Sequence, residues 1–170
     1  MLCVCVCVCR DNEDAYVSVN EQTCWVKSGL DGNDGEQLCG GIFKEEVFPI
    51  RNCYITLSAG GKKAKKTLPL TVRVWTNLDG KSDDESFAID NVAVKKVNEL
   101  PVGTVRVNKF DSLNNMEGWD CSKITECGNL GRICGGYEVK GKEVSIKQTY
   151  TNLPPGTYSL ELDFIKIDSW

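Results

Sequence analysis

The sequence predicts an all-β protein, more closely an antiparallel β-sandwich of jelly-roll-like type built as a circularly permuted module. Almost every periodic segment alternates apolar and polar residues, the period of a strand with one buried face. Clusters of Gly, Pro, Asn and Asp interrupt these segments at short intervals, and no stretch of a dozen residues carries a helical apolar stripe. About eight to ten short strands with this spacing are typical of sandwiches and jelly rolls.

The strands follow one another along the chain with a turn signal after most of them. The expected strands lie at 15–19, from 22 onward, at 45–50, 54–58, 70–75, 86–94, 143–150 and 158–164. The clearest turns are DGNDG at 31–35, AGG at 59–61, LDGKSDDE at 78–85, NLG at 129–131 and LPPG at 153–156.

The two ends of the sequence complement each other. The final DFIKIDSW continues a strongly alternating strand, and DNEDAYVSVN at 11–20 supplies an acidic turn followed by another strand. We therefore interpret 11–98 as the rear part of one module of a tandem array, 110–170 as the front part of the next, and 99–109 as a linker, the two parts forming one sandwich. Closure within a chain gives a permuted monomer, whereas exchange between two chains gives a domain-swapped dimer.

Residues 1–10, MLCVCVCVCR, fit neither part. A run of TG dinucleotides encodes alternating Cys and Val, so we interpret this low-complexity segment as an artefact of the gene model. A thiolate metal site is the alternative, although such sites usually contain CxxC pairs. A signal peptide would need a basic start and a cleavage site of small residues, and neither is present.

Six further cysteines follow this segment, an even number in a Gly-rich chain, which indicates disulfides and an oxidising compartment. Their connectivity does not follow from the sequence. The pairs closest in sequence, Cys24 with Cys39 and Cys127 with Cys134, are the simplest expectation. Zinc is the alternative, but these cysteines form no CxxC motif and the chain has no histidine. The six are Cys24, Cys39, Cys53, Cys121, Cys127 and Cys134.

Composition excludes several classes of function. A net charge of -4 argues against nucleic-acid binding, and GGKKAKK at 60–66 is interpreted as a solvated hairpin loop. No apolar run reaches membrane-spanning length, so we expect no membrane insertion by this segment. Without histidine, a Ser-His or Cys-His nucleophile is excluded. Carboxylates alone can support glycoside hydrolysis, but the sequence brings no particular pair together, and we expect no enzyme activity.

Joining the two ends gathers carboxylates. Asp168, Asp11 and Glu13 fall in one turn, and Glu85 and Asp90 fall in DDESFAIDN. Oxygen-rich loops at the edge of a sandwich suit calcium, so these five residues are the predicted metal ligands and calcium the predicted cofactor. The alternative is that such side chains cap turns through nearby backbone amides.

The four tryptophans raise the question of carbohydrate binding, because exposed indoles stack on sugar rings. Trp25 and Trp170 lie near the acidic turn and are the predicted ligand-binding residues. The alternative for each is packing in the core of the sandwich.

Several strings resemble repeated modules in large secreted or surface proteins of ciliates and other protists. The resemblance covers about 110–170 and 11–96 in permuted order, and ESFAIDNVAV is similar to the ends of MAM-type and other jelly-roll adhesion modules. The strings are LPPGTYSLELDFIKIDSW joined to DNEDAYVSVN, then QLCGG at 37–41, TNLDG at 76–80 and DDESFAIDNVAV at 83–94. This resemblance implies an extracellular architecture and adhesion-like roles.

We therefore expect a non-enzymatic extracellular or cell-surface module from a tandem-repeat protein, stiffened by calcium and contacting a surface glycan or protein partner. A carbohydrate-binding module of a larger secreted enzyme is the alternative.

Overall fold

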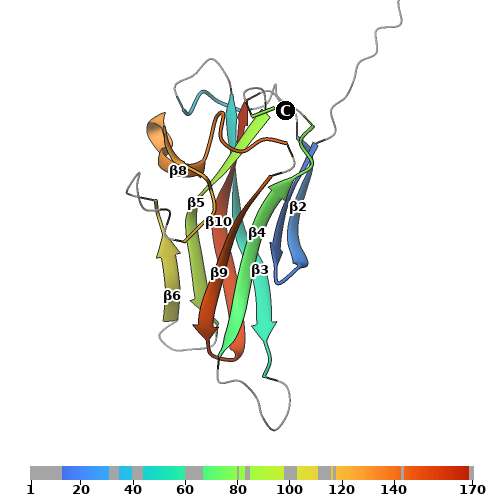
Figure 1. Cartoon of the computed structure of the whole chain (residues 1–170), viewed down its shortest axis with the longest axis vertical. Coiled ribbons are helices and arrows are strands. Elements are labelled where there is room, and N and C mark those ends of the chain that lie inside the picture. The colour runs from blue at the N-terminus through green and yellow to red at the C-terminus, as the bar shows by residue number, and fades with distance from the viewer. Residues whose placement is uncertain are drawn as a thin grey trace, which may run out of the picture.

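The computed structural model gives the chain as two packed antiparallel β-sheets, which confirms the expected sandwich (Figure 1). The structure describes residues 13–30, 35–39, 44–59, 67–79, 81–82, 85–97, 103–110, 116, 118–142 and 144–168.

Ten strands and one short 3-10 helix account for most of the described residues. Their bounds are β1 Glu13–Val19, β2 Gln22–Leu30, β3 Glu45–Leu57, β4 Leu68–Thr76, β5 Glu85–Lys96, β6 Gly103–Asn108, β7 Ile124–Cys127, η1 Gly128–Leu130, β8 Gly131–Gly135, β9 Ser145–Leu153 and β10 Gly156–Asp168.

The strand order interleaves the two ends of the chain. The first sheet, sheet A, has the order β2-β1-β4-β9, and the second, sheet B, has the order β3-β10-β5-β8-β7. β6 also pairs with β5, along Val92–Lys96, while β8 pairs with it at Ala88 and Ile89. Each sheet therefore combines strands from the 11–98 and 110–170 parts, and the assignment of these parts to two modules stays a prediction.

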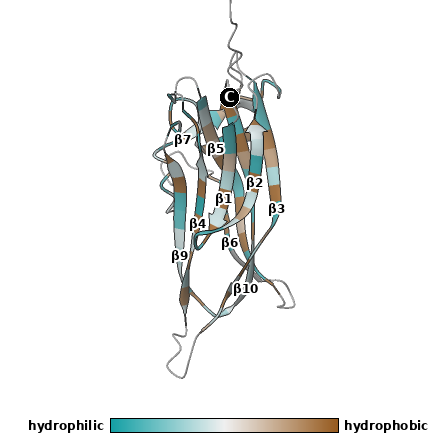
Figure 2. Cartoon of the chain, turned by 90° about the vertical axis from the view of Figure 1, so that its right-hand side faces the viewer, coloured by the Kyte–Doolittle hydropathy of each residue, from teal (hydrophilic) through white to brown (hydrophobic). Residues whose placement is uncertain are grey.

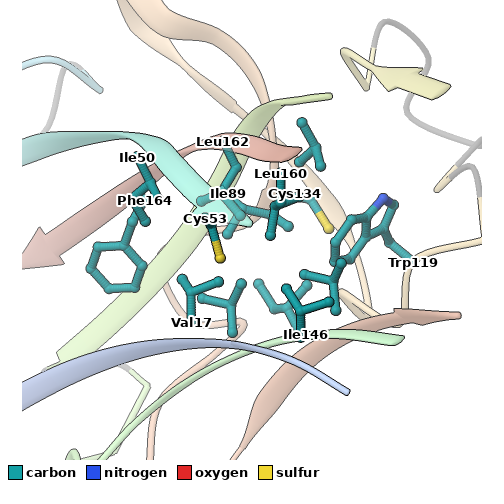
Figure 3. Packing of buried hydrophobic residues seen from close by; sticks show 14 of the residues in the cluster. Val17, Ile50, Cys53, Ile89, Trp119, Cys134, Ile146, Leu160, Leu162 and Phe164 are labelled. Atoms are coloured by element: carbon teal, nitrogen blue, oxygen red, sulfur yellow. The ribbon is translucent and has the colours of Figure 1, made fainter. Parts of the chain in front are cut away.

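The core lies between the sheets. Hydrophobic and hydrophilic residues alternate along most strands (Figure 2). Val17 and Ile146 of sheet A point toward Ile89, Leu160 and other apolar side chains of sheet B (Figure 3). Full burial of a side chain of this size contributes about 1.5–3 kcal/mol, so this alternation is the main reason that the sequence forms two sheets.

One expected boundary is wrong. The segments 45–50 and 54–58 form a single strand, β3, that runs through Pro49. A proline has no N–H to donate, so it is normally confined to an edge strand. β3 is the edge strand of sheet B, which explains why Pro49 does not interrupt it.

Disulfides close both lateral sides of the sandwich. Cys24 of β2 pairs with Cys53 of β3, joining the edge strands of the two sheets. On the other side, Cys121 pairs with Cys134 of β8. The third pair, Cys39–Cys127, joins the segment before β3 to β7.

The expectation of disulfides is confirmed, but both local pairings are wrong. Cys127 lies opposite Gly131 and Cys134 lies opposite Ile124, at opposite ends of the β7–β8 hairpin. Their side chains also belong to different apolar clusters, Cys134 to the main core and Cys127 to a smaller one. Proximity in sequence therefore does not bring these two sulfurs together.

Part of the expected linker is a strand. Residues 103–108 of the segment 99–109 form β6. Asn108 is buried, and its Oδ1 accepts hydrogen bonds from Trp119 Nε1 at 3.2 Å and from Tyr150 Oη at 3.0 Å. This segment is thereby integrated with sheet A through Tyr150 and with sheet B through β5.

Candidate functional site

Three carboxylates meet at one end of the sandwich, and we name them the polar-end cluster. Glu13 begins β1 in sheet A, Glu85 begins β5 in sheet B, and Asp79 lies in the connection between β4 and β5. One carboxylate oxygen from each lies within 4.8 Å of the others. Glu13 and Glu85 are buried, whereas Asp79 is exposed, so the cluster has a buried floor and an open side.

Strand alternation explains why two glutamates point inward. Glu13 shares a face of β1 with Ala15 and Val17, and Glu85 shares a face of β5 with Phe87, all in the core. Each glutamate is the first residue of its strand and occupies the outermost inward-facing position, at the end of the sandwich. The two sheets therefore turn these carboxylates toward each other.

Within the polar-end cluster, the environment of Glu13 disfavours the charged form of its carboxyl. Burial raises the pKa of the Glu13 carboxyl from its ordinary value of 4.5 to about 8, with further contributions from the charge of Glu85 and a shared proton with it. The charge of Asp79 adds to this effect, while its backbone N–H acts in the opposite direction. Both carboxylate oxygens of Glu13 are buried without a well-formed hydrogen bond from any described residue.

The donor set suits a hard cation. Three carboxylates supply oxygen ligands only, and oxygen is what Ca²⁺ and Mg²⁺ prefer. The Thr76 hydroxyl is another buried oxygen without a hydrogen-bond partner among the described residues. It lies on the inner face of β4, opposite Ala15 in the register of β1 and β4.

The structure brings together only some of the predicted metal ligands. Glu13 and Glu85 meet, and the backbone of Asp168 lies opposite Glu85 in the β5–β10 register. Asp90 is five residues further along β5, or about 17 Å at strand spacing, so it cannot share an ion with Glu85. Asp11 and the side chain of Asp168 lie outside the described residues.

Asp90 occupies a separate site. It lies opposite Asp163 of β10, beside an irregularity in the pairing of β5 with β10. Asp163 accepts a hydrogen bond from Asn91 Nδ2 at 2.9 Å and forms an ion pair with Arg51 at 2.5 Å. Asp163 thus has polar partners on both β3 and β5, and Asp90 lies opposite it on β5, away from the polar-end cluster.

Sequence reasoning missed Asp79. It follows Leu78 in the TNLDG segment, which we interpreted only as a turn. Leu78 is buried, and its position in the core fixes where the next residue leaves the sandwich. The signal that could have identified Asp79 is its position directly after the apolar Leu78 and a few residues before the acidic DDE segment at 83–85.

The predicted ligand-binding tryptophans do not form a surface site in the described residues. The Trp25 ring is partly buried against the core, with its centroid 5.8 Å from the Phe164 ring and 6.3 Å from the Phe48 ring. Trp170 lies outside the described residues. Trp25 thus packs partly against the core, and a ligand-binding role for it stays a prediction.

A second feature is a polar groove on the outer face of sheet A, with a volume of about 770 Å³. Cross-strand neighbours line it in rows. One row runs from Thr23 through Ser18 and Arg73 to Lys147, and the next pairs Thr71 with Thr149. The remaining lining residues are Asn20, Glu21, Trp75, Asp120 and Ser145.

Trp75 stands at one end of this groove. Tyr16, its cross-strand neighbour on β1, stacks on it with the ring centroids 4.0 Å apart and the planes at 9°. The guanidinium carbon of Arg73 lies 5.4 Å from the centroid of the Trp75 ring. The groove thus joins a half-buried aromatic pair to rows of hydroxyl and charged groups.

Comparisons of the chain with models of protein families, with curated proteins and with solved structures find no match. Among the described residues, no helix has the length and apolar character needed to cross a membrane.

Proposed function

We propose that this protein is a non-enzymatic extracellular module of a tandem-repeat surface protein, with a structural or adhesive role and a circularly permuted strand order. The observation that carries the proposal is the position of β1. It is inserted between β2 and β4 in sheet A, and it begins at the end of the sandwich where β10 of sheet B stops (Figure 1). Glu85 links the two, since its backbone pairs with Asp168 and its side chain reaches Glu13.

The strand order supports a permuted jelly roll. When β1 is placed after β10, the chain changes sheet at each step from β2 to β5, forms β6 beside β5, and then alternates through β9 and β10 to β1. That path, with sheets β2-β1-β4-β9 and β3-β10-β5-β6, is the one expected for the eight strands of a jelly roll. The β7–β8 hairpin is then an insertion between β6 and β9.

The disulfides support an extracellular location. Three cross-links in a domain of this size are typical of secreted proteins and rare in reducing compartments. Cys24–Cys53 joins the edge strands of the two sheets, and Cys121–Cys134 fastens β8, which suits a module that resists mechanical or proteolytic stress.

A circular permutant tests the proposal. The natural residues 169–170 and 11–12 would join β10 to β1 directly, and new termini would open in 98–102. We expect a monomer with the same three disulfides and a melting temperature within a few degrees of the original, because the new connection spans ends that lie together.

A permutant opened inside β4, between Val72 and Arg73, is the matched control and should not fold, because β4 is central in sheet A. Failure of the first permutant to fold, or its scrambling of the disulfides, would contradict the proposed order. A stable dimer of the original chain at low concentration, measured by light scattering, would favour strand exchange between two chains over the closed monomer.

The groove on sheet A favours a second candidate, a carbohydrate-binding module. Its charges balance, with Arg73 and Lys147 against Glu21 and Asp120, so it suits a neutral ligand rather than a polyanion. Its hydroxyl rows match the hydrogen-bonding groups of a sugar, and the Tyr16–Trp75 pair offers an apolar wall beside them.

A glycan array compares the two candidates. Binding that is lost in Trp75→Ala and in Lys147→Ala, and retained in Tyr54→Ala, would favour carbohydrate recognition by the groove. Tyr54 is a suitable control because it is an exposed aromatic side chain on β3 of the other sheet. Absence of binding to any neutral glycan would leave the structural and adhesive module as the better candidate.

A further inference from the structure

We propose that Glu13, Asp79 and Glu85 form a calcium site that ties the start of β1 in sheet A to the start of β5 in sheet B. The three carboxylates converge from two sheets and one connecting segment, with their ligand oxygens within 4.8 Å of each other. Oxygens bound to Ca²⁺ at 2.3–2.6 Å lie up to about 5 Å apart, so one ion fits among them without rearrangement of the strands.

The state of Glu13 points to a ligand independently of the clustering. Its side chain is only 4% exposed, and neither of its oxygens accepts a well-formed hydrogen bond from the described residues. A buried carboxylate without donors is costly, so such groups are normally paired or bind a metal. The groups that Glu13 reaches are the backbone N–H of Asp79, which gives it no well-formed hydrogen bond, and the Glu85 carboxyl, which can supply a donor only by holding a proton.

A buried glutamate elsewhere at the same end shows what a purely structural carboxylate looks like. Glu45 begins β3 and is 2% exposed. Its Oε2 accepts hydrogen bonds from the backbone N–H of Leu38 at 2.6 Å and of Cys39 at 3.1 Å. Glu45 is therefore satisfied by the protein itself, whereas Glu13 is not.

The chemistry of the ligands selects calcium. Soft or borderline metals prefer thiolate or imidazole, but the chain has no histidine and its six cysteines beyond residue 10 are all in disulfides. Mg²⁺ retains most of its water, which a buried floor formed by Glu13 and Glu85 does not accommodate. Ca²⁺ tolerates irregular geometry, and water entering beside the exposed Asp79 can complete its shell.

The ion would fasten the two sheets where strands enter and leave the sandwich. A further role of the ion, to stiffen the connection between β10 and β1, rests on the proposed function, because these two strands are consecutive only in the permuted order. The binding site itself does not depend on that order, because all three ligands belong to one sandwich.

Thermal unfolding of the full chain tests the site. After treatment with EDTA, the melting temperature would be measured against CaCl₂ up to about 10 mM, since extracellular calcium modules bind with dissociation constants of about 10⁻⁴–10⁻³ M. We expect the melting temperature to rise with the logarithm of the calcium concentration above the dissociation constant, by about 5 to 10 °C when calcium reaches about 100 times that constant. Isothermal titration calorimetry should give one calcium per chain, and the same concentration of MgCl₂ should give a smaller shift.

Three variants locate the ion. Glu13→Gln and Asp79→Asn should each weaken calcium binding at least about tenfold. Asp79→Asn keeps the test decisive if the buried substitution disturbs folding, because Asp79 is exposed. Glu36→Gln is the matched control, an exposed carboxylate in the segment beside Glu45, and it should retain the full shift.

No rise in melting temperature with CaCl₂ would overturn the site, and would indicate that the pair holds a proton instead. An unchanged shift in both Glu13→Gln and Asp79→Asn would overturn it as well, because calcium would then bind elsewhere. The circular permutant answers the separate question of strand order, so either proposal can fail while the other stands.

Discussion

Two buried glutamates begin strands at the same end of the sandwich and have opposite environments. Glu45 of β3 accepts two backbone hydrogen bonds from the segment before its own strand. Glu13 of β1 accepts no well-formed bond from the described residues and shares its space with Glu85. Burial of a carboxylate therefore does not by itself indicate a ligand site. What separates Glu13 from Glu45 is that the Glu13 oxygens accept no well-formed hydrogen bond from the described residues.

The region around Glu45 is built to satisfy that glutamate. Gly35 approaches so closely that a Cβ on it would lie 2.4 Å from the Glu45 carbonyl oxygen, and its φ is +117°. Glu36 and Glu45 also exchange two backbone hydrogen bonds, of 2.9 and 2.7 Å. The segment 35–39 is thus fastened by Glu45 on one side and by the Cys39–Cys127 disulfide on the other.

The largest expected effect is that of Glu45→Ala. The substitution removes the acceptor for the N–H groups of Leu38 and Cys39 and leaves a gap at the start of β3, so it should lower the free energy of unfolding by about 3 kcal/mol. Urea denaturation with the disulfides intact measures the loss. Glu36→Ala, an exposed side chain in the same segment, should change it by less than about 0.5 kcal/mol. Equal losses in the two variants would contradict the structural role of Glu45.

The second effect is a pH dependence that belongs to Glu13. Its pKa is about 8 in the folded chain and 4.5 ordinarily, so the folded state binds the proton more tightly. Without calcium, the contribution of Glu13 to the free energy of unfolding is therefore fully present below about pH 4.5. It is lost as the pH rises toward 8, by at most about 1.4 kcal/mol per pH unit.

Denaturation in EDTA between pH 5 and 8 measures this slope. In Glu13→Gln the slope should be smaller, and the variant should exceed the original chain in stability by about 2 kcal/mol at pH 8, because a neutral amide can donate to Glu85. A variant less stable than the original chain at every pH would show that Glu13 resembles Glu45 after all.

A third, smaller effect is the coupling between Glu13 and Glu85. Each single substitution to Gln relieves the repulsion for both residues, so the double variant should gain less than the sum of the two, with an interaction energy of about 1 kcal/mol. A double-mutant cycle at pH 8 in EDTA measures it. Additive effects would mean that the carboxylates do not interact in solution.

The smallest effect is that of Asp79→Asn on stability without calcium. Asp79 is exposed, so the change should stay within about 0.5 kcal/mol, although the same substitution should weaken calcium binding. Paired unfolding measurements in EDTA and in CaCl₂ separate the two effects. A large loss in EDTA would indicate that Asp79 supports the β4–β5 connection rather than an ion.

Much of the fold could be predicted because strand alternation is a local property. The strand expected at 158–164 is part of β10, and its apolar residues Tyr158, Leu160, Leu162 and Phe164 are all buried in the core. β7 and β8 were missed because they are four and five residues long and rich in Gly and Cys. β3 was divided in two because Arg51 and Asn52 are consecutive exposed residues that interrupt the alternation, at an irregularity in the pairing of β3 with β10 that only the sheet reveals.

Less of the candidate site could be predicted. Glu13 and Glu85 were expected among the metal ligands because both lie in acidic segments at strand starts. Asp90 was grouped with Glu85 because they are close in sequence, but an extended strand separates them. Asp79 was missed because Asp before Gly is an ordinary turn signal, and nothing local distinguishes a turn residue from a ligand.

By itself the sequence determined the class of fold, the buried face of most strands, the presence of disulfides and the absence of histidine chemistry, since each depends on composition or on residues a few positions apart. Tertiary structure alone decided which cysteines pair, which glutamate finds donors, and that Asp79 joins Glu13 and Glu85. Those outcomes depend on contacts between strands distant in sequence, where the order of strands in each sheet sets the partner of every side chain.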